Sequence, residues 1–186
     1  MSLKAVKIKR SMADYKALTD MYNKSFPKAE RFPIILLRIM SHLSGIHSVA
    51  FYDDSQLCGF SYFLTNEDTV FILFLAVNSE IRSKGYGSRI LSWIKENHPN
   101  KVIFLDVEKL DENAENNVQR VKRVDFYKKN GIYQTNSFFT YDDVTYEILS
   151  TNTDFSREDY ERNFKSYIKI FKKRKNRSEK RNNYDR

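Results

Sequence analysis

The chain has 186 residues, 41% of them hydrophobic and 30% charged, which is enough for one domain with its own core. No apolar run approaches the roughly 18 residues that cross a bilayer, and the first residues alternate charged and apolar side chains, so neither a transmembrane segment nor a signal peptide is expected. A single cysteine, Cys58, excludes an internal disulfide framework, and three scattered histidines predict no metal site. The cytoplasm is the expected location.

The N-terminal part of the chain predicts one strand and two helices. Charged and apolar residues alternate in Val6–Lys9, which is typical of a half-exposed strand. A first helix is expected to follow Ser11, a candidate N-cap, and a second helix to begin at Pro33 and end near Gly45. The loop between these helices, Phe26–Pro33, contains two prolines and two aromatic residues.

A hairpin and a buried strand come next. Ser48–Tyr52 and Leu57–Leu64 are expected to pair across the turn at residues 53–55. Phe71–Val77 is a run of seven apolar residues, too short for a free helix and rich in branched and aromatic types, so it predicts a buried strand. Apolar residues resume with helical spacing in Ser88–Asn97. The chain therefore passes from a strand through a polar loop into a helix.

This polar loop has the character of a phosphate-binding site. The first turn of a helix carries backbone N–H groups without intrahelical partners, and glycine lets a phosphate approach them. Arg82 and Lys84 add positive charge beside Gly85 and Gly87. A nucleotide P-loop requires Gly-Lys-Ser/Thr at the start of the helix, and a dinucleotide fingerprint requires a third glycine where Ile90 stands, so both fit poorly.

The next part predicts a second parallel strand, a helix and a closing hairpin. Val102–Val107 is expected to lie parallel to the earlier apolar strand through a right-handed crossover. A helix from about Asn117 ends at Gly131, which is typical of a glycine C-cap. Residues 132–139 and 144–149 form the hairpin. The predicted fold class is α/β, with a single mixed sheet of about seven strands and helices on both faces.

Most of the positive charge lies at the C-terminus. The net charge is +8, and residues 157–186 contain 12 Lys and Arg against 5 Asp and Glu, a net charge of +7, which leaves +1 for residues 1–156. Residues 1–150 are expected to form the folded domain, and residues 151–186 an amphipathic helix with a basic tail, Lys172–Arg177 at its centre. That tail is either a solvated terminus or a contact for RNA, an anionic membrane or an acidic partner.

Two motifs carry a resemblance to a known family. The stretch Val77–Gly87 has the order Val-x4-Arg-x2-Gly-x-Gly and resembles the acetyl-coenzyme A loop of GNAT-type N-acetyltransferases, Arg/Gln-x-x-Gly-x-Gly/Ala. Asp125–Ile132 is similar to the family's Phe-Tyr-x-Lys-x-Gly-Phe, at the end of a helix that enters a strand. The order of predicted elements over Val6–Ser150 also resembles that of the family. The resemblance implies the GNAT fold and acetyl-coenzyme A as co-substrate.

The chain departs from the family pattern at two places. Many members carry an asparagine that contacts the cofactor seven residues before the motif tyrosine, where this chain has Arg120. Asn116 and Asn117 lie earlier, in a longer loop, so that role is not transferred to them. A proline that is common after the cofactor strand is replaced by Asn78-Ser79.

The resemblance also implies which residues bind and activate the cofactor. The backbone N–H of Val77 would polarise the acetyl carbonyl, and Tyr127 would act as general acid for the leaving thiolate. The cofactor-binding residues that the resemblance implies are Leu75, Ala76, Val77, Arg82, Ser83, Lys84, Gly85, Tyr86, Gly87, Ser88, Phe126 and Lys129.

The acceptor side is less well defined. An alkyl amine has a pKa of about 10.4, so it must lose a proton before it attacks the thioester. Asp106 and Glu108 fall on one face near the end of the second parallel strand, and Glu30 and Phe32 lie in the aromatic loop expected to line the acceptor site. Any of these carboxylates, or a chain of waters, is a candidate route for the proton.

The sequence thus predicts an N-acetyltransferase that moves an acetyl group from acetyl-coenzyme A to a primary amine by direct attack, without a covalent enzyme intermediate or a metal. The acceptor is a small amine, an amino acid, an antibiotic amine or a protein terminus, and a homodimer is left open. The alternatives are transfer of another acyl group, and a coenzyme A-responsive or nucleic-acid-binding module on the same fold without turnover.

Overall fold

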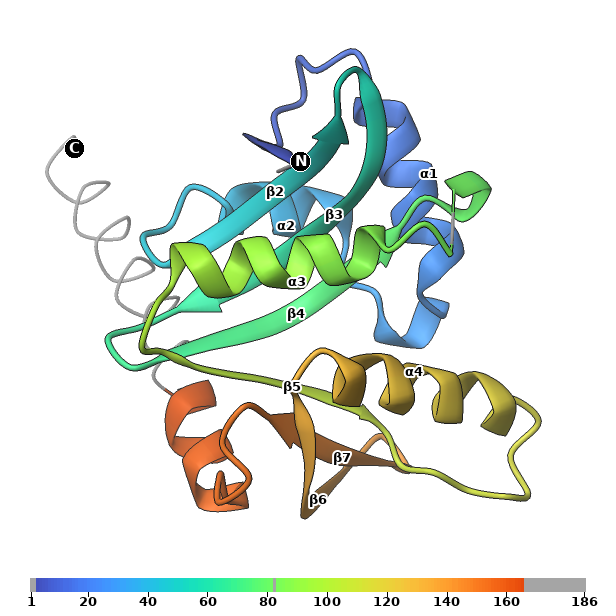
Figure 1. Cartoon of the computed structure of the whole chain (residues 1–186), viewed down its shortest axis with the longest axis vertical. Helices are drawn as coiled ribbons and strands as arrows, with labels where there is room; N and C mark the ends of the chain where they lie inside the picture. Colours follow the sequence, from blue (N-terminus) through green and yellow to red (C-terminus); the bar gives the residue numbers. More distant parts are fainter. Residues whose placement is uncertain (1–2, 82, 166–186) are drawn as a thin grey trace, which may run out of the picture. The chain divides into compact units, whose positions relative to one another are not determined.

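The computed structural model describes residues 3–81 and 83–165. Its strands form one seven-stranded sheet in the order β1-β2-β3-β4-β5-β7-β6 (Figure 1). This confirms the predicted fold class of a mixed sheet with helices. The strands are β1 (Lys4–Lys7), β2 (Ile46–Asp53), β3 (Gln56–Thr65), β4 (Thr69–Val77), β5 (Val102–Glu108), β6 (Tyr133–Tyr141) and β7 (Val144–Ser150).

The helices separate these strands in the expected order. The helices are α1 (Tyr15–Ser25), α2 (Ile34–Met40), α3 (Tyr86–Asn97) and α4 (Asn117–Lys129), with short 3-10 turns η1 (Lys28–Glu30) and η2 (Ser79–Ile81). A further helix begins at residue 157 and is described to residue 165. The chain divides into two compact units, Met1–Leu105 and Asp106–Arg186. A domain boundary at residue 150 stays a prediction.

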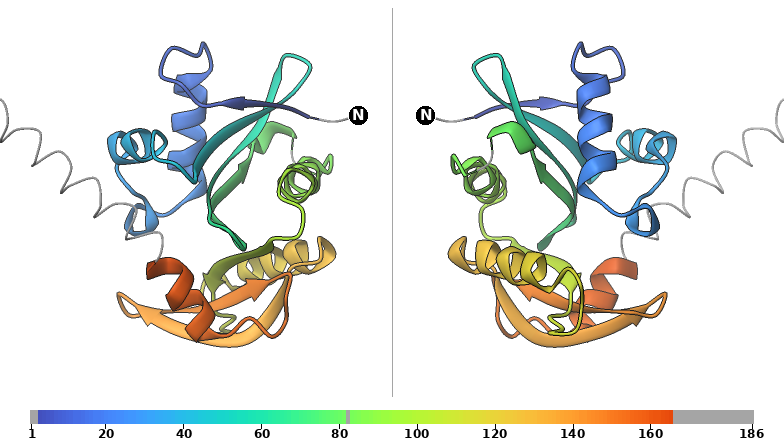
Figure 2. Two further views of the ribbon diagram at one scale, coloured as in Figure 1. Left: turned by 90° about the vertical axis from the view of Figure 1, so that its left-hand side faces the viewer. Right: turned by 90° about the vertical axis from the view of Figure 1, so that its right-hand side faces the viewer.

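In the first unit, helices cover both faces of strands β2 to β4. On one face, Leu18 and Tyr22 of α1 and Leu37 of α2 pack against Phe60 and Phe74 of the sheet. On the other face lies α3, whose Trp93 meets Phe51 edge to face with ring centroids 5.3 Å apart. Figure 2 shows α3 opposite α1 and α2 across these strands. Burial of apolar groups on both faces explains why β4 is an almost continuous apolar run.

Gly59 of β3 allows α3 to lie close to the sheet. A Cβ atom at Gly59 would clash with the carbonyl oxygen of Ala76 and would lie 3.0 Å from Cδ1 of Ile90. Val77, the register partner of Gly59, is the last residue of β4. The missing side chain therefore sets how closely the start of α3 approaches the end of β4.

Two register shifts interrupt the antiparallel ladders of this unit. Between β2 and β3, Phe51 pairs with Gly59 and Tyr52 with Leu57, so Cys58 is an extra residue on β3. Between β3 and β4, Tyr62 pairs with Phe74 and Phe63 with Ile72, so Leu73 is an extra residue on β4. An extra residue bends its strand and increases the local twist.

The second unit contains α4, the β6–β7 hairpin and the helix at residues 157–165. Val124 and Tyr127 of α4 are buried, as are Ile132 and Ile148. The last helix packs on the hairpin through Tyr160, whose ring stacks on that of Phe139 at a centroid distance of 4.8 Å.

The ends of two helices differ from the prediction. The first helix begins at Tyr15 rather than after Ser11, and Asp14 is its N-cap residue. The Asp14 carboxylate accepts a hydrogen bond from the Tyr52 hydroxyl, 3.2 Å away, so Asp14 is tied to β2 instead of capping the helix through its side chain. The second helix ends at Met40, before Gly45.

Two other expectations concern membrane-spanning helices and the basic C-terminal run. None of the helices in the described part is both long and apolar enough to cross a bilayer. The basic run Lys172–Arg177 lies outside the described residues.

A pair of histidines predicts an acid-sensitive fold. His47 stacks on Phe63 and meets His98 edge to face, with ring centroids 5.5 Å apart. Burial lowers the pKa of both histidines, the charge of Lys101 adds to this effect, and His98 further lowers the pKa of His47. Below a pH of about 6.5 the unfolded chain therefore binds more protons than the folded one, and the free energy of unfolding should fall as the pH decreases.

Thermal unfolding between pH of about 5 and 8 measures this effect. His98→Phe keeps an aromatic ring and removes one titrating group, so its stability should depend less on pH than that of the wild type. His42→Gln, at an exposed histidine, is the control and should keep the wild-type slope. Equal slopes for all three proteins would refute the prediction.

Substitution of Gly59 should destabilise the first unit. Gly59→Ala is expected to lower the free energy of unfolding by about 1–3 kcal/mol, because the Ala76 carbonyl oxygen belongs to the backbone and cannot move aside. Denaturant titration measures the loss. Ile90→Val removes the Cδ1 atom but leaves the Ala76 carbonyl in place, so the double variant should stay destabilised; full recovery would show that the Ile90 contact alone matters.

Candidate functional site

At the end of β4, one edge of the strand lies beyond the ladder pairs with β5 that the structure describes. In the parallel ladder with β5, Thr69, Val70 and Phe71 pair with residues 102–104, and the described pairs end there although β4 continues to Val77. The amide of Asn78 donates to the Cys58 carbonyl of β3 at 2.8 Å. Because N–H directions alternate along an antiparallel strand, the N–H groups of Val77 and Leu75 point away from β3.

The bulge at Leu73 accounts for this arrangement. It lies between the part of β4 that pairs with β5 and the last residues of the strand. Beyond it, Ala76 is buried in the core under α1 and α2, whereas Leu75 and Val77 are half-buried. The three predicted residues of β4 therefore share a strand end but not a side-chain environment, and only the main chains of Leu75 and Val77 face the edge away from β3.

The loop between β4 and α3 has the geometry of an anion site. Ser83, Lys84 and Gly85 are exposed, and Ser83 (φ 66°) and Gly85 (φ 76°) both adopt the left-handed backbone conformation. At Gly85, the N-cap residue of α3, glycine adopts this conformation without the strain of a Cβ atom. Arg82, the other predicted cation of the loop, lies outside the described residues.

The first turn of α3 supplies the amides. The first hydrogen bond of the helix runs from the Arg89 amide to the Gly85 carbonyl, at 3.0 Å. The N–H groups of Tyr86, Gly87 and Ser88 precede it, and such first-turn groups have no intrahelical acceptor. Together with the helix dipole, such amides are suited to bind a phosphate group.

The side chains of Tyr86 and Arg89 are turned towards the β2–β3 hairpin. The Tyr86 hydroxyl donates to Oδ2 of Asp53 at 3.0 Å. Both terminal nitrogens of Arg89 donate to the same carboxylate, at 2.9 and 3.3 Å. The hydrogen bonds from Arg89 and Tyr86 lower the pKa of Asp53. The Tyr86 side chain is thus engaged with Asp53, so only the backbone of Tyr86 is left for the predicted cofactor contact. Asp53 was not among the predicted site residues, because its position in the sequence indicates only a turn.

Tyr127 lies in the last turns of α4 and is 8% exposed. Burial raises its pKa to about 12, with a smaller opposing effect of Arg123 and a further increase from Asp106. No hydrogen-bond partner of its hydroxyl is found in the described part of the chain. Its neighbour Phe126 is half-buried.

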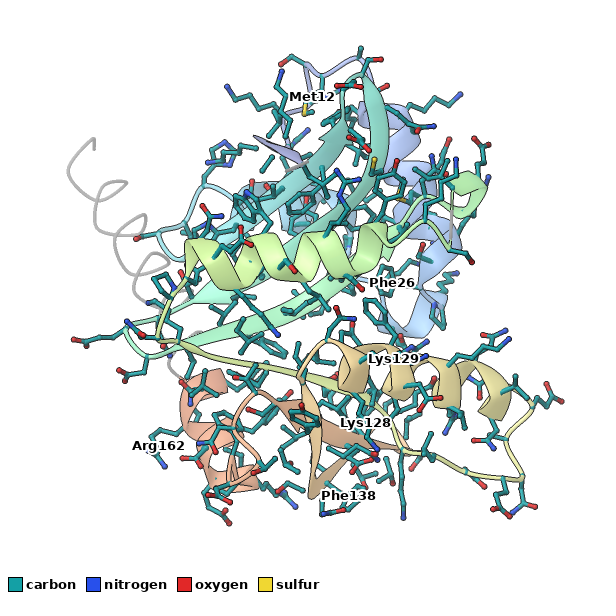
Figure 3. The ribbon with its side chains drawn as sticks, viewed as in Figure 1. Met12, Phe26, Lys128, Lys129, Phe138 and Arg162 are labelled. Carbon is teal, nitrogen blue, oxygen red and sulfur yellow. The ribbon has the colours of Figure 1, made fainter. Side chains whose placement is uncertain are left out.

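Lys129 closes α4 as a basic residue of its last turn. Like Lys128 it is exposed, and both are labelled on α4 in Figure 3. The structure therefore places the predicted residues of the second motif on one short stretch of one helix. They are a buried phenol, a half-buried ring and an exposed ammonium group.

The two carboxylates at the end of β5 have different partners. Glu108 forms an ion pair with Arg120 at 3.0 Å, with side chains 12% and 15% exposed, and a longer one with Arg123 at 3.6 Å. Asp106 accepts a hydrogen bond from the Tyr160 hydroxyl at 2.9 Å. Burial, with the charge of Asp106, raises the pKa of Tyr160. These contacts attach β5 to α4 and to the last helix, so both carboxylates have a structural role.

Arg120 holds together the region where the family pattern has its asparagine. Its Nε donates to Oδ1 of Asn116 at 2.8 Å, and its Nη1 donates to the Lys109 carbonyl at 2.7 Å. Asn116 in turn donates to Glu108 at 3.2 Å. The departure from the family pattern is therefore accompanied by a local network that fixes the start of α4.

On the acceptor side, Phe32 is 40% exposed and its ring lies 6.0 Å from that of Phe74. The Tyr22 hydroxyl accepts from the Phe32 amide at 2.8 Å and donates to the Phe32 carbonyl at 3.2 Å, which fixes the loop on α1. Phe26, also labelled in Figure 3, packs on Phe74 at 4.8 Å. Glu30 ends the η1 turn of the same loop.

One buried carboxylate, Glu147, could not be predicted from the sequence. Glu147 of β7 is 3% exposed and accepts a hydrogen bond from Gln134 of β6 at 2.7 Å. Its position inside an alternating strand carries no signal that sets it apart from surface glutamates. Within residues 3–81 and 83–165, no three His, Cys, Asp or Glu side chains are grouped so that they could hold a metal ion.

Comparison with known proteins agrees with this architecture. The family profile described as an acetyltransferase (GNAT) domain matches residues 44–131, which include both motifs up to Gly131. Among curated proteins, none matches this sequence significantly.

Several solved structures share the fold. A GNAT-family protein from Bacteroides thetaiotaomicron superposes with a TM-score of 0.68 at 24% identity, over 85% of this chain and 92% of that one. The aminoglycoside 6'-N-acetyltransferase from Enterococcus faecium gives 0.58 at 16% identity, over 81% and 97%. A GNAT family acetyltransferase from Elizabethkingia anophelis with acetyl-CoA bound gives 0.54 at 11% identity, over 81% and 98%.

The profile match and the shared fold lead to the same assignment. The seven-stranded sheet with its β4–loop–α3 unit lies where the profile matches, and the solved structures extend the likeness over most of the chain. Residues 44–131 therefore match the acetyltransferase (GNAT) domain, and the chain shares the fold of solved GNAT acetyltransferases.

Proposed function

We propose that this protein transfers an acetyl group from acetyl-coenzyme A to a primary amine by direct attack. The observation that carries the proposal is the loop at the start of α3, where the amides of Tyr86, Gly87 and Ser88 follow two left-handed residues. This is the geometry that a pyrophosphate requires. Solved structures of the same fold contain coenzyme A or acetyl-coenzyme A, which supports the same ligand here.

The loop would bind the pyrophosphate through its backbone. The helix dipole contributes about 0.3–1 kcal/mol for each anionic group, so the amides and the cations Arg82 and Lys84 must act together. Lys129, exposed at the end of α4, is a further candidate for a phosphate contact. The half-buried ring of Phe126 is proposed to pack on the cofactor.

The end of β4 would bind the thioester. In the proposed reaction the amine nitrogen forms a bond to the acetyl carbon, and the carbon–sulfur bond then breaks. Negative charge develops first on the carbonyl oxygen, and the N–H of Val77, turned away from β3, is the proposed donor to it. Leu75 and Ala76 hold this strand end in place through the core and the sheet.

Tyr127 would stabilise the leaving thiolate. Because its pKa is raised to about 12, the phenol stays protonated at neutral pH and can donate a hydrogen bond. Complete proton transfer to a thiolate of pKa about 8.5 is uphill by roughly 5 kcal/mol. The proposed role is therefore a hydrogen bond from the phenol to the sulfur as the bond breaks, and the released thiolate takes its proton from solvent.

The amine proton is proposed to leave through water. Glu108 is a weaker candidate for the base than the sequence indicates, because its oxygens already accept from Arg120 and Asn116. Asp106 and Glu30 remain candidates that a water chain could connect. The loop with Phe32 is proposed to contact the acceptor, which is a small amine, an amino acid, an antibiotic amine or a protein terminus.

Several finer points stay proposals. The cytoplasmic location, a homodimer and an anionic partner of the basic tail are retained as expectations from the sequence. The alternative function, a module that binds coenzyme A or nucleic acid without turnover, is separated from the enzyme by experiment.

Two assays test the function. Calorimetry with acetyl-coenzyme A measures binding, and release of the coenzyme A thiol with a panel of amines, including aminoglycosides, measures turnover. Binding followed by amine-dependent thiol release supports the enzyme. Binding without turnover by any amine favours the module, and absence of binding refutes the proposal.

Tyr127→Phe should slow turnover without weakening the cofactor. The variant removes one hydroxyl from a buried ring, and loss of a general acid lowers kcat by about 10²–10⁴-fold. The dissociation constant of coenzyme A should stay near the wild-type value. Tyr133→Phe, at an exposed tyrosine, is the matched control and should keep full activity. Equal kcat values in wild type and Tyr127→Phe would remove the proposed role.

Gly87→Val should have the opposite effect. A branched side chain in the first turn of α3 would crowd the pyrophosphate, and loss of even one hydrogen bond to a charged group weakens binding by about tenfold or more. Ser92→Val introduces the same side chain at an exposed position of α3 and serves as control. Calorimetry with coenzyme A and thermal unfolding of both variants separate a binding defect from loss of fold; unchanged affinity in Gly87→Val would count against the loop.

A further inference from the structure

We propose that Asp53 is a positioning residue for the cofactor loop: it attaches the start of α3 to the β2–β3 hairpin, while Asn78 attaches the beginning of the loop to the same hairpin. The inference rests on the proposed function, since it assigns the loop's geometry to acetyl-coenzyme A binding. Asp53 itself does not contact the cofactor in this account. It acts through Tyr86 and Arg89.

The first attachment is at the helix end of the loop. Arg89 and Asp53 form a two-pronged ion pair, in which each side chain is 30% exposed. Tyr86, which is 7% exposed, adds a hydroxyl hydrogen bond to the same carboxylate oxygen as Arg89 Nη1. The Arg89 guanidinium also lies over the Tyr86 ring, 5.1 Å from its centroid. Three contacts therefore converge on one carboxylate from the first turn of α3.

The second attachment is at the strand end of the loop. The Asn78 amide donates to the Cys58 carbonyl at 2.8 Å, and its side-chain Nδ2 donates to the Leu57 carbonyl at 3.2 Å. Asn78 Oδ1 accepts from the Glu80 amide at 3.1 Å, and its carbonyl accepts from the Ile81 amide at 3.2 Å. Asn78 thus joins the hairpin to the η2 turn.

The hairpin is built to make both attachments. The extra residue Cys58 bends β3 just after the turn, so that residues 53 and 57–58 of one short segment meet residues 78 and 86–89. A loop whose two ends are fixed to one rigid segment loses less conformational freedom when it binds a ligand. The hairpin would therefore raise cofactor affinity without touching the cofactor.

The effect of removing the Asp53 charge distinguishes a positioning role from simple repulsion of the cofactor. A carboxylate beside an anion site repels the anion, so if Asp53 were only a neighbouring charge its removal would tighten binding. Because Asp53 is paired with Arg89, its negative charge is largely cancelled. Its removal should instead free Tyr86 and Arg89 and loosen the turn.

The test compares Asp53→Asn with Asp54→Asn. Both substitutions remove one negative charge from the same turn, but Asp53 has the contacts described here and Asp54, with φ of 53°, occupies the turn beside it. For each protein, calorimetry gives the dissociation constant of coenzyme A, and kinetics with acetyl-coenzyme A and the best amine gives KM and kcat. Amide hydrogen exchange at residues 83–89 is measured without ligand.

Asp53→Asn is expected to weaken coenzyme A binding and raise KM by about tenfold, the usual effect of losing a hydrogen bond to a charged group, with kcat within about twofold of wild type. Exchange at residues 86–89 should be faster than in the wild type. Asp54→Asn should match the wild type in all three measurements. Unchanged or tighter binding in Asp53→Asn overturns the proposal, as does a fall in kcat with KM unchanged.

Two further results keep the outcome clear. If Asp53→Asn does not fold, Arg89→Lys replaces it, because lysine keeps the charge but loses the two-pronged geometry; a normal KM in that variant overturns the proposal. If the wild type does not bind coenzyme A, the proposed function fails. The exchange comparison still decides whether Asp53 orders the loop.

Discussion

The bulge at Leu73 is the constraint on which the candidate site depends. A regular β4 would continue its ladder with β5, and the N–H groups near its end would be used up in the sheet. With one extra residue the strand bends, the described pairs with β5 end at Phe71, and the later N–H groups of β4 point away from β3. Backbone polarity is thereby kept available inside an otherwise apolar strand.

The rest of the first unit holds that strand end and the following loop in register. Gly59 brings α3 close to the end of β4, and the β2–β3 hairpin fixes both ends of the loop between them. In the second unit, the ion pairs of Glu108 and the hydrogen bond from Tyr160 to Asp106 fix β5 to its helices. In each unit, these polar contacts therefore position the backbone rather than take part in a reaction.

Local patterns predicted the elements well, and long-range contacts are what they missed. The apolar run of β4, the glycines before α3 and the helix end at Gly131 each carry a signal within a few residues. Asp53 carries none, because Tyr86 and Arg89 lie 33 and 36 residues away. For the same reason the sequence made Glu108 a candidate base, because its ion pair with Arg120, 12 residues later, carries no local signal. Likewise, the hydrogen bond between Asp14, the N-cap residue of α1, and Tyr52 joins residues 38 positions apart and has no signal in the sequence.

The burial of Cys58 has a practical consequence. The chain's one cysteine is fully enclosed in the bulge of β3, and burial raises the pKa of its thiol, so it is a poor nucleophile in the folded protein. A disulfide reagent would therefore react with the thiol of released coenzyme A and not with Cys58 of the folded protein. In the absence of substrates, the same reagent would label Cys58 only when the β2–β3 hairpin opens locally. The rate of labelling would therefore measure local unfolding of this hairpin.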